Sequence, residues 1–350
     1  MAPHAPRKRG IKRLAVAGIA LATAVVLAAC SGTGSGSGST NAAGLTTMNY
    51  QLSWLKLTQF GGYFAAEKQG FYTDEHIAPT FTAGGSNILA WQQVVTGKAQ
   101  LGDEDNTNAL VAIGKGQPLV IIGSIFQTSP FAIMSLESKP INSIQDFAGK
   151  TIAVPDAALA QFKALVSQAG IPDGKVNFIS AGTDPTQLTT GQADGYAGYA
   201  TSQGASLQIK GIKIHSLYLE DLGVPSYGNV IVTTKDEIKN HRTDLVNFLK
   251  ASIKGYEYMN ANPQQIADYV VTTVNPAGGL DQKTEEQTAV VQKTLIESPK
   301  GVLWVNADKM QKIIDSLVAA GTLKSSIKAS DIVDTSLLTD AYGGKTSLLP

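Results

Sequence analysis

From Met48 onward, short apolar runs alternate with amphipathic segments, and Gly, Pro or Asp separates each pair. This alternation is typical of α/β proteins, in which strands and helices take turns along the chain. The apolar runs predict strands near residues 48–53, 79–82, 99–102, 118–124, 130–136, 151–154, 174–180, 193–198, 214–219 and 228–234. We therefore expect an α/β fold.

Helices are predicted where apolar residues recur at three- and four-residue spacing. One begins at Ser86 or Asn87, either of which can cap a helix, and ends before Gly97. A second covers 156–169, and Asp184-Pro185 begins a third, because proline suits the first helical turn. After about residue 235 the pattern is helical over 236–261, 263–274, 281–298 and 306–321.

A terminal run of helices needs a surface to pack on, so we expect it to return to the part of the fold made first. The predicted organisation is one α/β lobe over 46–137, a second over 138–230 and a return to the first over 231–350. Two chain crossings between lobes form a hinge and a cleft, and small-molecule sites favour such clefts.

The first 45 residues predict export and anchoring. Five basic residues and no acid precede an apolar stretch over 14–28, which is shorter than the roughly 20 residues of a membrane span. The stretch ends in Leu27-Ala28-Ala29-Cys30, which resembles the lipobox of bacterial lipoproteins, and Cys30 is the only cysteine. We expect a signal peptide over 1–29, then a lipidated Cys30 and a flexible tether over 30–45 that hold the protein on the outer face of the cell membrane.

The charge balance argues against nucleic acid as a partner. Removing residues 1–29 takes away five of the 28 basic residues and none of the 28 acidic ones, which leaves a net charge of −5. A chain that binds nucleic acid usually carries a basic surplus. The folded part that follows the tether is long enough for two domains with full hydrophobic cores.

The order of several short motifs is more specific than any of them alone. They are Leu52-Ser53-Trp54, Gly62-Tyr63-Phe64-Ala65-Ala66, Gly97-Lys98-Ala99-Gln100-Leu101-Gly102, Asp146-Phe147-Ala148-Gly149-Lys150-Thr151-Ile152 and Gly191-Gln192-Ala193-Asp194-Gly195. In this order they resemble the solute-binding proteins that serve thiamine-pyrimidine precursors, riboflavin, sulfonates and nitrate, over about residues 46–300. Phe126-Gln127 and Asp184-Pro185 look most like the branch for thiamine-pyrimidine precursors or riboflavin. The resemblance implies a type II periplasmic-binding fold, with the permease and cytoplasmic ATPase of an ABC importer as partners.

Aromatic residues near the end of the first strand are candidate ligand contacts. Trp54 follows that strand, and the carboxyl ends of strands open onto the cleft of an α/β sheet. An indole can stack on a flat heteroaromatic ring, although Trp54 could also be a core residue. Phe60 and Tyr63 could complete an aromatic wall, and Tyr63 could equally pack against the next strand.

Polar candidates lie near the next strand end. Asp103 and Asp105 follow Gly102, where they could accept hydrogen bonds from an aminopyrimidine or a flavin edge and would repel an anion. They could equally cap the following helix. Asn87 could offer its amide to a ligand, or it could be an ordinary cap.

Further candidates lie near the crossings and in the second lobe. Phe126 and Gln127 end the strand that leads toward the first crossing, and Asp184 precedes a helix of the second lobe. Tyr196 and Tyr199 end a strand that we expect to face the cleft, where a ring could close over a heterocycle. Tyrosines are also common at the edges of cores.

Catalysis is not expected. Enzymes of this fold that make the thiamine pyrimidine use a lysine-bound pyridoxal phosphate, a histidine and a cysteine-rich segment, whereas His76, His215 and His241 lie far apart and Cys30 stands alone. We therefore expect no cofactor and no metal. The expected function is capture, by a monomer, of a small planar heterocycle, first a thiamine-precursor pyrimidine. Riboflavin or a sulfonate- or nitrate-type anion is the alternative solute, and a surface scaffold without a solute is the rival class.

Overall fold

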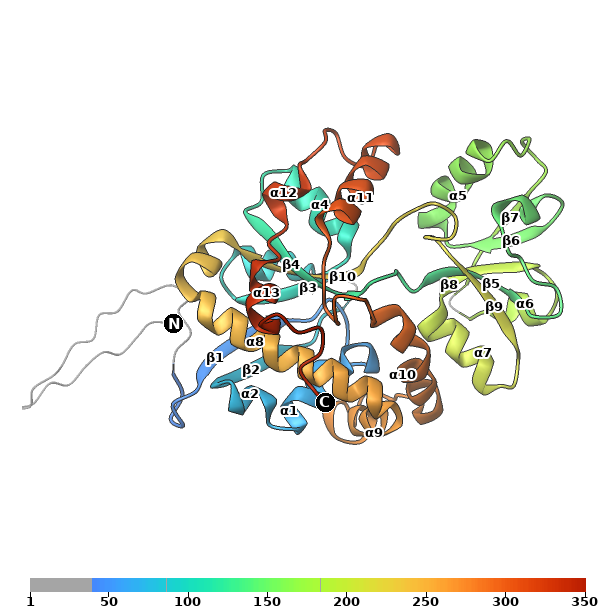
Figure 1. Ribbon diagram of the computed structural model, residues 1–350. Helices are drawn as coiled ribbons and strands as arrows, with labels where there is room; N and C mark the ends of the chain where they lie inside the picture. Colours follow the sequence, from blue (N-terminus) through green and yellow to red (C-terminus); the bar gives the residue numbers. More distant parts are fainter. Residues whose placement is uncertain (1–39, 86, 183) are drawn as a thin grey trace, which may run out of the picture. The chain divides into compact units, whose positions relative to one another are not determined.

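Two five-stranded sheets organise the chain in the computed structural model, which describes residues 40–350 except Ser86 and Thr183 (Figure 1). The predicted signal peptide over 1–29 and the lipidation site at Cys30 lie outside the described residues. All ten strands expected from the apolar runs form. The first sheet contains β1 (Thr46–Gln51), β2 (Ile77–Thr82), β3 (Leu101–Glu104), β4 (Leu119–Phe126) and β10 (Gly228–Thr234); the second contains β5 (Phe131–Leu136), β6 (Thr151–Val154), β7 (Asn177–Ser180), β8 (Gly195–Tyr199) and β9 (Ile214–Tyr218).

The first sheet has the strand order β2-β1-β3-β10-β4. Strand β1 runs parallel to β2 and β3, whereas β10 runs antiparallel to β3 and β4. The carboxyl ends of β1, β3 and β4 therefore share one edge of the sheet with the amino end of β10. In the register of that edge, Gly228 lies opposite Phe126 and Val230 opposite Glu104.

The second sheet has the order β7-β6-β8-β5-β9, with β5 antiparallel to both of its neighbours. Phe131, which begins β5, pairs with Tyr199, which ends β8. The sequence had assigned residues 131–136 to the first lobe, but the pairing of β5 with β8 and β9 places them in the second sheet. Two segments, 127–130 and 219–227, connect the sheets, so the architecture is α/β with two lobes and a hinge of two chain crossings.

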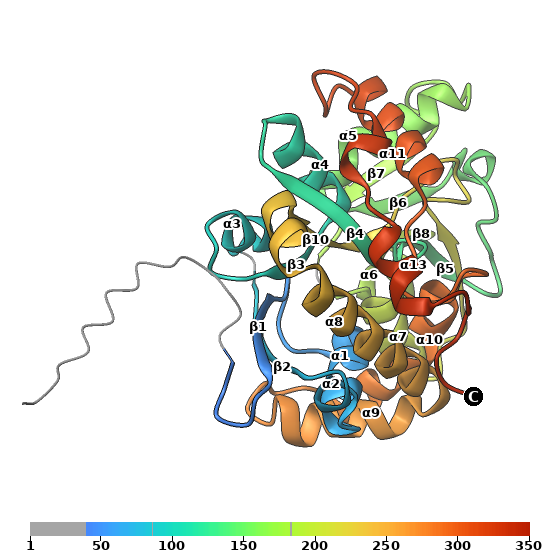
Figure 2. The same cartoon turned by 60° about the vertical axis from the view of Figure 1, so that its left-hand side comes forward.

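Helices surround both sheets (Figure 1). Those before the second crossing are α1 (Gly61–Lys68), α2 (Phe71–Asp74), α3 (Ala90–Val95), α4 (Asn106–Gly114), α5 (Asp156–Gln168), α6 (Thr186–Thr189) and α7 (Ala205–Ile209), with 3-10 helices η1 (Thr58–Phe60) and η2 (Ile144–Phe147) and the π-helix η3 (Ala200–Gly204). After β10 follow α8 (Lys235–Ala261), α9 (Pro263–Tyr269), the π-helix η4 (Val270–Val274), α10 (Gln282–Ile296), α11 (Ala307–Ala319), α12 (Ala329–Ile332) and α13 (Ser336–Tyr342). Figure 2 shows α13 beside α8.

One helix begins later than the sequence predicts. Helix α3 starts at Ala90 with Leu89 as its N-cap, so Asn87 is not the cap. The reason is the segment before it: Gly84 N donates to the Trp54 carbonyl at 2.8 Å, which holds this segment against the loop that follows β1. Ser86, the other expected cap, lies outside the described residues.

The cores of the two lobes differ in composition. In the first lobe, the Phe248 ring from α8 stacks on Tyr50 and Tyr72 at centroid distances of 5.5 and 5.3 Å. In the second lobe, alternate residues of each strand face opposite sides of the sheet, as the twofold period of a strand requires. Ile133 thus packs in one mainly aliphatic cluster and Met134 in another.

Candidate functional site

A hydrogen-bonded group of three side chains marks the shared edge of the first sheet. Ser53 follows β1, Asp103 lies in β3, and Asn229 lies in β10. The Asp103 carboxylate accepts from Ser53 Oγ at 2.5 Å, from Ser53 N at 3.3 Å and from Asn229 Nδ2 at 2.8 Å, and Asn229 Nδ2 also lies 2.7 Å from Ser53 Oγ. Asn229 has φ of +57°, a conformation that asparagine tolerates better than most residues. The group therefore ties three strand ends together.

Asp103 is fully buried inside this group. Burial raises the pKa of Asp103 to about 7, and this effect outweighs the hydrogen bonds from Ser53 and Asn229, which act to lower the pKa. The sequence had placed Asp103 after a strand ending at Gly102, but β3 continues to Glu104 and directs the carboxylate inward. Ser53 and Asn229 are its hydrogen-bond partners, so Asp103 holds the loop of Ser53 in place.

Three of the expected aromatic contacts lie in the core. Phe60, Tyr63 and Phe126 are buried, and the Tyr63 hydroxyl lies 2.7 Å from that of Tyr50. Burial raises the pKa of both tyrosines well above the usual value. As placed, these side chains support the edge of the sheet from beneath and do not form its surface.

Trp54, in contrast, remains exposed at this edge, with 40% of its surface accessible. The close approach of Gly84 fixes its backbone, because a Cβ at Gly84 would collide with the backbone of Leu52 and Ser53. Three neighbouring apolar side chains are exposed as well: Leu55, Ile88 and Leu89. Sequence reasoning missed these three, although their positions next to Trp54 and Asn87 were a signal that could have found them.

The edge of the second sheet presents Tyr199, which is 45% exposed and lies edge-on to Phe131. Protein atoms around its hydroxyl, and then the negative charge of Asp105 in the first lobe, raise the pKa of Tyr199 to about 12. Asp105 is exposed and caps α4 by accepting from Thr107 N at 2.9 Å. The Tyr199 ring of the second lobe and the Asp105 carboxylate of the first lobe are thus both exposed.

Tyr196 and Asp184 have structural partners. The Tyr196 ring is buried, and its hydroxyl donates to the carbonyl of Gly182. Asp184 is exposed and accepts from Thr186 N at 2.9 Å, at the start of α6. Asn87 is exposed on the side of the first lobe that carries Trp54, in the segment held by Gly84.

Gln127 belongs to the hinge. Its Nε2 donates to the Trp304 carbonyl at 2.7 Å, and its own carbonyl accepts from Lys309 Nζ at 2.6 Å. Lys309 also pairs with Glu220 in the second crossing, with Nζ 2.7 Å from Oε1. Thr128 Oγ1 donates to the same carboxylate at 2.6 Å. One lysine of α11 therefore connects both crossings.

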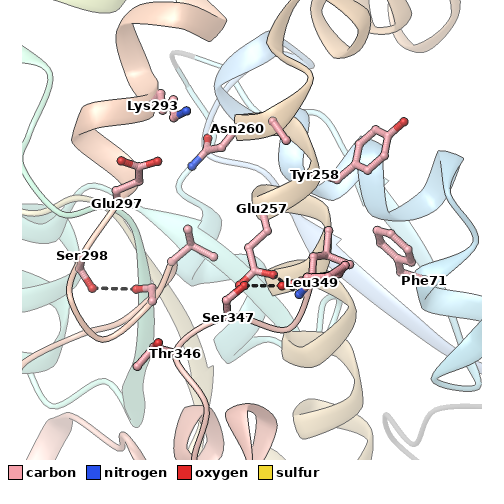
Figure 3. Close-up of a pocket in the computed structure, with 14 residues that line it drawn as sticks. Phe71, Glu257, Tyr258, Asn260, Lys293, Glu297, Ser298, Thr346, Ser347 and Leu349 are labelled. Atoms are coloured by element: carbon pink, nitrogen blue, oxygen red, sulfur yellow. Dashed lines mark hydrogen bonds between the residues drawn. The ribbon is translucent and has the colours of Figure 1, made fainter.

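A separate hollow of about 590 Å³ lies on the first lobe, and Trp54 is not one of its lining residues (Figure 3). Lys293, Glu297 and Asn260 line it on one side, and the segment with Ser347 closes another. The Glu257 carboxylate at its margin accepts from the backbone N–H groups of 348 and 349. This carboxylate is therefore engaged by the chain itself.

Within residues 40–350, apart from 86 and 183, no group of His, Cys, Asp or Glu has the arrangement of a metal site. No helix in the same range combines the length and apolar character needed to cross a bilayer.

Comparison with known proteins gives the same fold. The formylaminopyrimidine-binding protein of Halalkalibacterium halodurans is 23% identical over 82% of this chain and 89% of its own length. The riboflavin-binding protein RibY of Chloroflexus aurantiacus is 23% identical over 72% of each chain. The periplasmic aliphatic sulphonate-binding protein SsuA of Escherichia coli superposes with a TM-score of 0.59 at 13% identity, over 82% of this chain and 92% of that one.

These matches confirm the periplasmic-binding fold that the sequence motifs predicted. The sequence profile of the family described as NMT1/THI5 like matches residues 57–266, which include most of the first sheet and all of the second. That segment is more than half of the chain. The protein therefore belongs to the NMT1/THI5-like family.

Proposed function

We propose that this protein is the extracytoplasmic solute-binding lipoprotein of an ABC importer, and that its solute is a thiamine-precursor pyrimidine. The observation that carries the proposal is the pair of exposed aromatic side chains, Trp54 and Tyr199, at the edges of two sheets joined by a hinge. Exposed rings at such a position can hold a flat heterocycle when the lobes close. The similarity to a formylaminopyrimidine-binding protein supports the same class of solute.

The charge at this edge favours an amine-bearing ring over an anion. Asp103, Glu104 and Asp105 are consecutive at the end of β3. Asp105 is exposed, so its carboxylate can accept from ring amino groups, while the buried Asp103 holds the loop that carries Trp54. A sulfonate or nitrate would have to enter beside these acids, and like charges repel. In this proposal Trp54, Tyr199, Asp105 and Asn87 contact the solute.

The test is a calorimetric titration of the protein with hydroxymethylpyrimidine, formylaminopyrimidine, riboflavin, taurine and nitrate. We expect a pyrimidine to bind, and Trp54→Ala to weaken that binding by about tenfold, because stacking is worth on the order of 1 kcal/mol beyond area burial. Trp91→Phe is the matched control, since Trp91 packs against the core from α3. Binding that is unaffected by Trp54→Ala would contradict this site.

Riboflavin is the second candidate, favoured by the similarity to a riboflavin-binding protein. Its isoalloxazine ring would offer a larger stacking surface to Trp54 and Tyr199. Quenching of flavin fluorescence on addition of protein, without any response to the pyrimidines, would favour riboflavin over the first proposal.

Two rival classes need separate readouts. A relative from Legionella pneumophila is named 4-amino-5-hydroxymethyl-2-methylpyrimidine phosphate synthase, so catalysis is one rival. A binding protein should return its solute chemically unchanged after long incubation, which mass spectrometry can follow. A scaffold lipoprotein, the other rival, should show no thermal stabilisation by any member of the panel, whereas a bound solute raises the melting temperature by mass action.

The membrane anchor can be tested independently of the solute. We propose that Cys30 carries the lipid, since it ends the apolar stretch of the amino-terminal segment. Cells fed an alkyne fatty acid should label the protein, and Cys30→Ser should abolish the label and release the protein from the membrane fraction. Retention of the label in Cys30→Ser would place the lipid elsewhere.

A further inference from the structure

Helix α10 makes buried polar contacts with both lobes. On the side of the first lobe, Glu285 Oε2 accepts from Thr58 N at 2.9 Å and Gln292 Nε2 donates to the Thr58 carbonyl at 3.0 Å. On the side of the second lobe, Thr288 Oγ1 donates to the carbonyl of Thr201 at 2.5 Å. All five side chains are buried. One helix therefore holds backbone groups of both lobes.

The two backbone partners of α10 lie next to the proposed aromatic contacts. Thr58 begins η1, four residues after Trp54, and Thr201 lies in the π-helix η3, two residues after Tyr199. Single π-helical turns are frequent at functional sites. Tyr199 itself is held by its backbone N–H, which donates to Gln203 Oε1 of the same turn at 2.9 Å. Movement of α10 would thus reach both aromatic residues through short stretches of chain.

Stability alone accounts poorly for this polar contact. Thr58 Oγ1 and Gln292 Oε1 are buried, and neither has a hydrogen-bond partner among the described residues. A buried polar atom without a partner costs about 1–3 kcal/mol, and an apolar contact of similar shape would avoid that cost. A polar contact of this kind does, however, fix the relative position of the elements that share it, because its hydrogen bonds are directional.

We propose that Thr288 and Glu285 are positioning residues, which set the separation between the Trp54 loop and the Tyr199 turn and thereby tune solute binding. This inference rests on the proposed function for its effect on binding, but not for its effect on lobe separation. Gln287 adds a rim contact, since its Nε2 donates to Gln208 Oε1 of α7 at 2.8 Å. Thr288 therefore acts as the buried part of the link and Gln287 as its half-buried margin.

The separation between the two lobes can be measured on the full chain by double electron–electron resonance between two spin labels. Exposed Lys115 after α4 and exposed Lys163 in α5 report on the two lobes when each is replaced by a spin-labelled cysteine, in a Cys30→Ser background. We expect Thr288→Val to broaden or shift the distance distribution. Thr288→Ser keeps the hydroxyl and should match the wild type. Gln287→Ala removes only the contact with Gln208, so it should change the distance distribution less than Thr288→Val does.

A control separates positioning from general loss of stability. Val154→Ala opens a cavity in the core of the second lobe and should lower the melting temperature without altering the distance distribution. For hydroxymethylpyrimidine, Thr288→Val should weaken binding about fivefold to tenfold, the equivalent of one lost hydrogen bond, and Thr288→Ser less than about twofold.

The outcomes distinguish this inference from the proposed function. A distance distribution for Thr288→Val identical to that of the wild type overturns the inference, whatever the solute. A changed distribution in a protein that binds none of the panel would support the link through α10 and count against the proposed solute. A changed distribution with unchanged pyrimidine affinity would remove the positioning role.

Discussion

The two lobes treat their aromatic residues differently. In the first lobe, Trp54 stands exposed above a closely packed base in which Tyr50 and Tyr63 join hydroxyl groups beneath the sheet edge. In the second lobe, Tyr199 is exposed at the end of a strand whose neighbouring clusters are mainly aliphatic, and a π-helix follows directly. The first lobe thus supports its exposed ring on a packed aromatic layer, here called the aromatic base, whereas the second lobe presents its exposed ring at the end of a strand.

The largest expected effect tests the aromatic base of the first lobe. Phe248→Ala removes a buried ring that stacks on Tyr50 and Tyr72, and it should lower the free energy of unfolding by about 3–5 kcal/mol. Trp54→Ala, which removes an exposed ring, should cost less than about 1 kcal/mol. Urea unfolding followed by circular dichroism measures both values. An equal loss of unfolding free energy in the two variants would contradict the distinction between the buried aromatic base and the exposed ring of Trp54.

Asp103, the buried carboxylate near the aromatic base, gives the next largest effect, which appears in the pH dependence of stability. Since the pKa of Asp103 is raised to about 7 in the folded state, the folded protein binds this proton more tightly than the unfolded chain does. The stabilising contribution is therefore full below about pH 4 and is lost as the pH rises to about 7. Relative to Asp103→Asn, the wild type should lose up to about 4 kcal/mol over this range, at about 1.4 kcal/mol per pKa unit.

Ser53→Ala sharpens the same measurement. The Ser53 hydroxyl donates to Asp103 and lowers the pKa of that carboxyl, so its removal should move the transition to higher pH. Unfolding free energies between pH 4 and 8 would show the shift. Parallel pH profiles for the wild type and Asp103→Asn would mean that burial does not raise the pKa of Asp103.

A smaller effect concerns Gly84, which holds the backbone of the Trp54 loop. Gly84→Ala places a Cβ against the backbone of Leu52 and Ser53, so the Trp54 loop must move. We expect a loss of about 1–3 kcal/mol in stability and a weaker affinity for the solute. Gly182→Ala in the second lobe is the matched control, because its Cβ would meet nothing closer than 4.0 Å. Calorimetry of both variants decides whether Trp54 needs this fixed loop.

The smallest effect concerns the hinge between the two lobes. Lys309→Met breaks the pair with Glu220 and the bond to the Gln127 carbonyl, and should cost about 1 kcal/mol, less at high salt. Lys213→Met breaks a pair with Glu137 that is exposed on both sides, and it should cost almost nothing. Chemical unfolding at low and high salt checks both. Equal effects would show that the hinge pair is an ordinary surface contact.

Much of the fold could be predicted because periodicity reports directly on strands and helices. All ten strands and the long helices after residue 235 lie close to their predicted positions. The first crossing was placed too late because residues 130–136 read as a strand in either lobe, and the choice depends on pairing with β8 and β9. Pairing between strands distant in sequence leaves no mark in the local pattern.

The candidate site was less predictable, since a residue's distance from a strand end does not fix the direction of its side chain. A two-residue shift in the end of β3 turned Asp103 from a surface acid into a buried one. Phe60 and Tyr63 lie on the side of their helices that faces the core, which the sequence between Trp54 and Gly70 cannot specify. Ser53 and Asn229 became visible as partners only after folding brought β1 and β10 to one edge.

The position of β10 also affects how the molecule can be built. In the first sheet, β10 lies between β3 and β4, yet its residues follow the whole second lobe in sequence. A chain that emerges amino end first therefore carries β4 without its neighbouring strand until residues 228–234 arrive. Contacts of such long sequence separation close slowly. Completion of the first sheet thus waits for a strand that is made only after the whole second lobe.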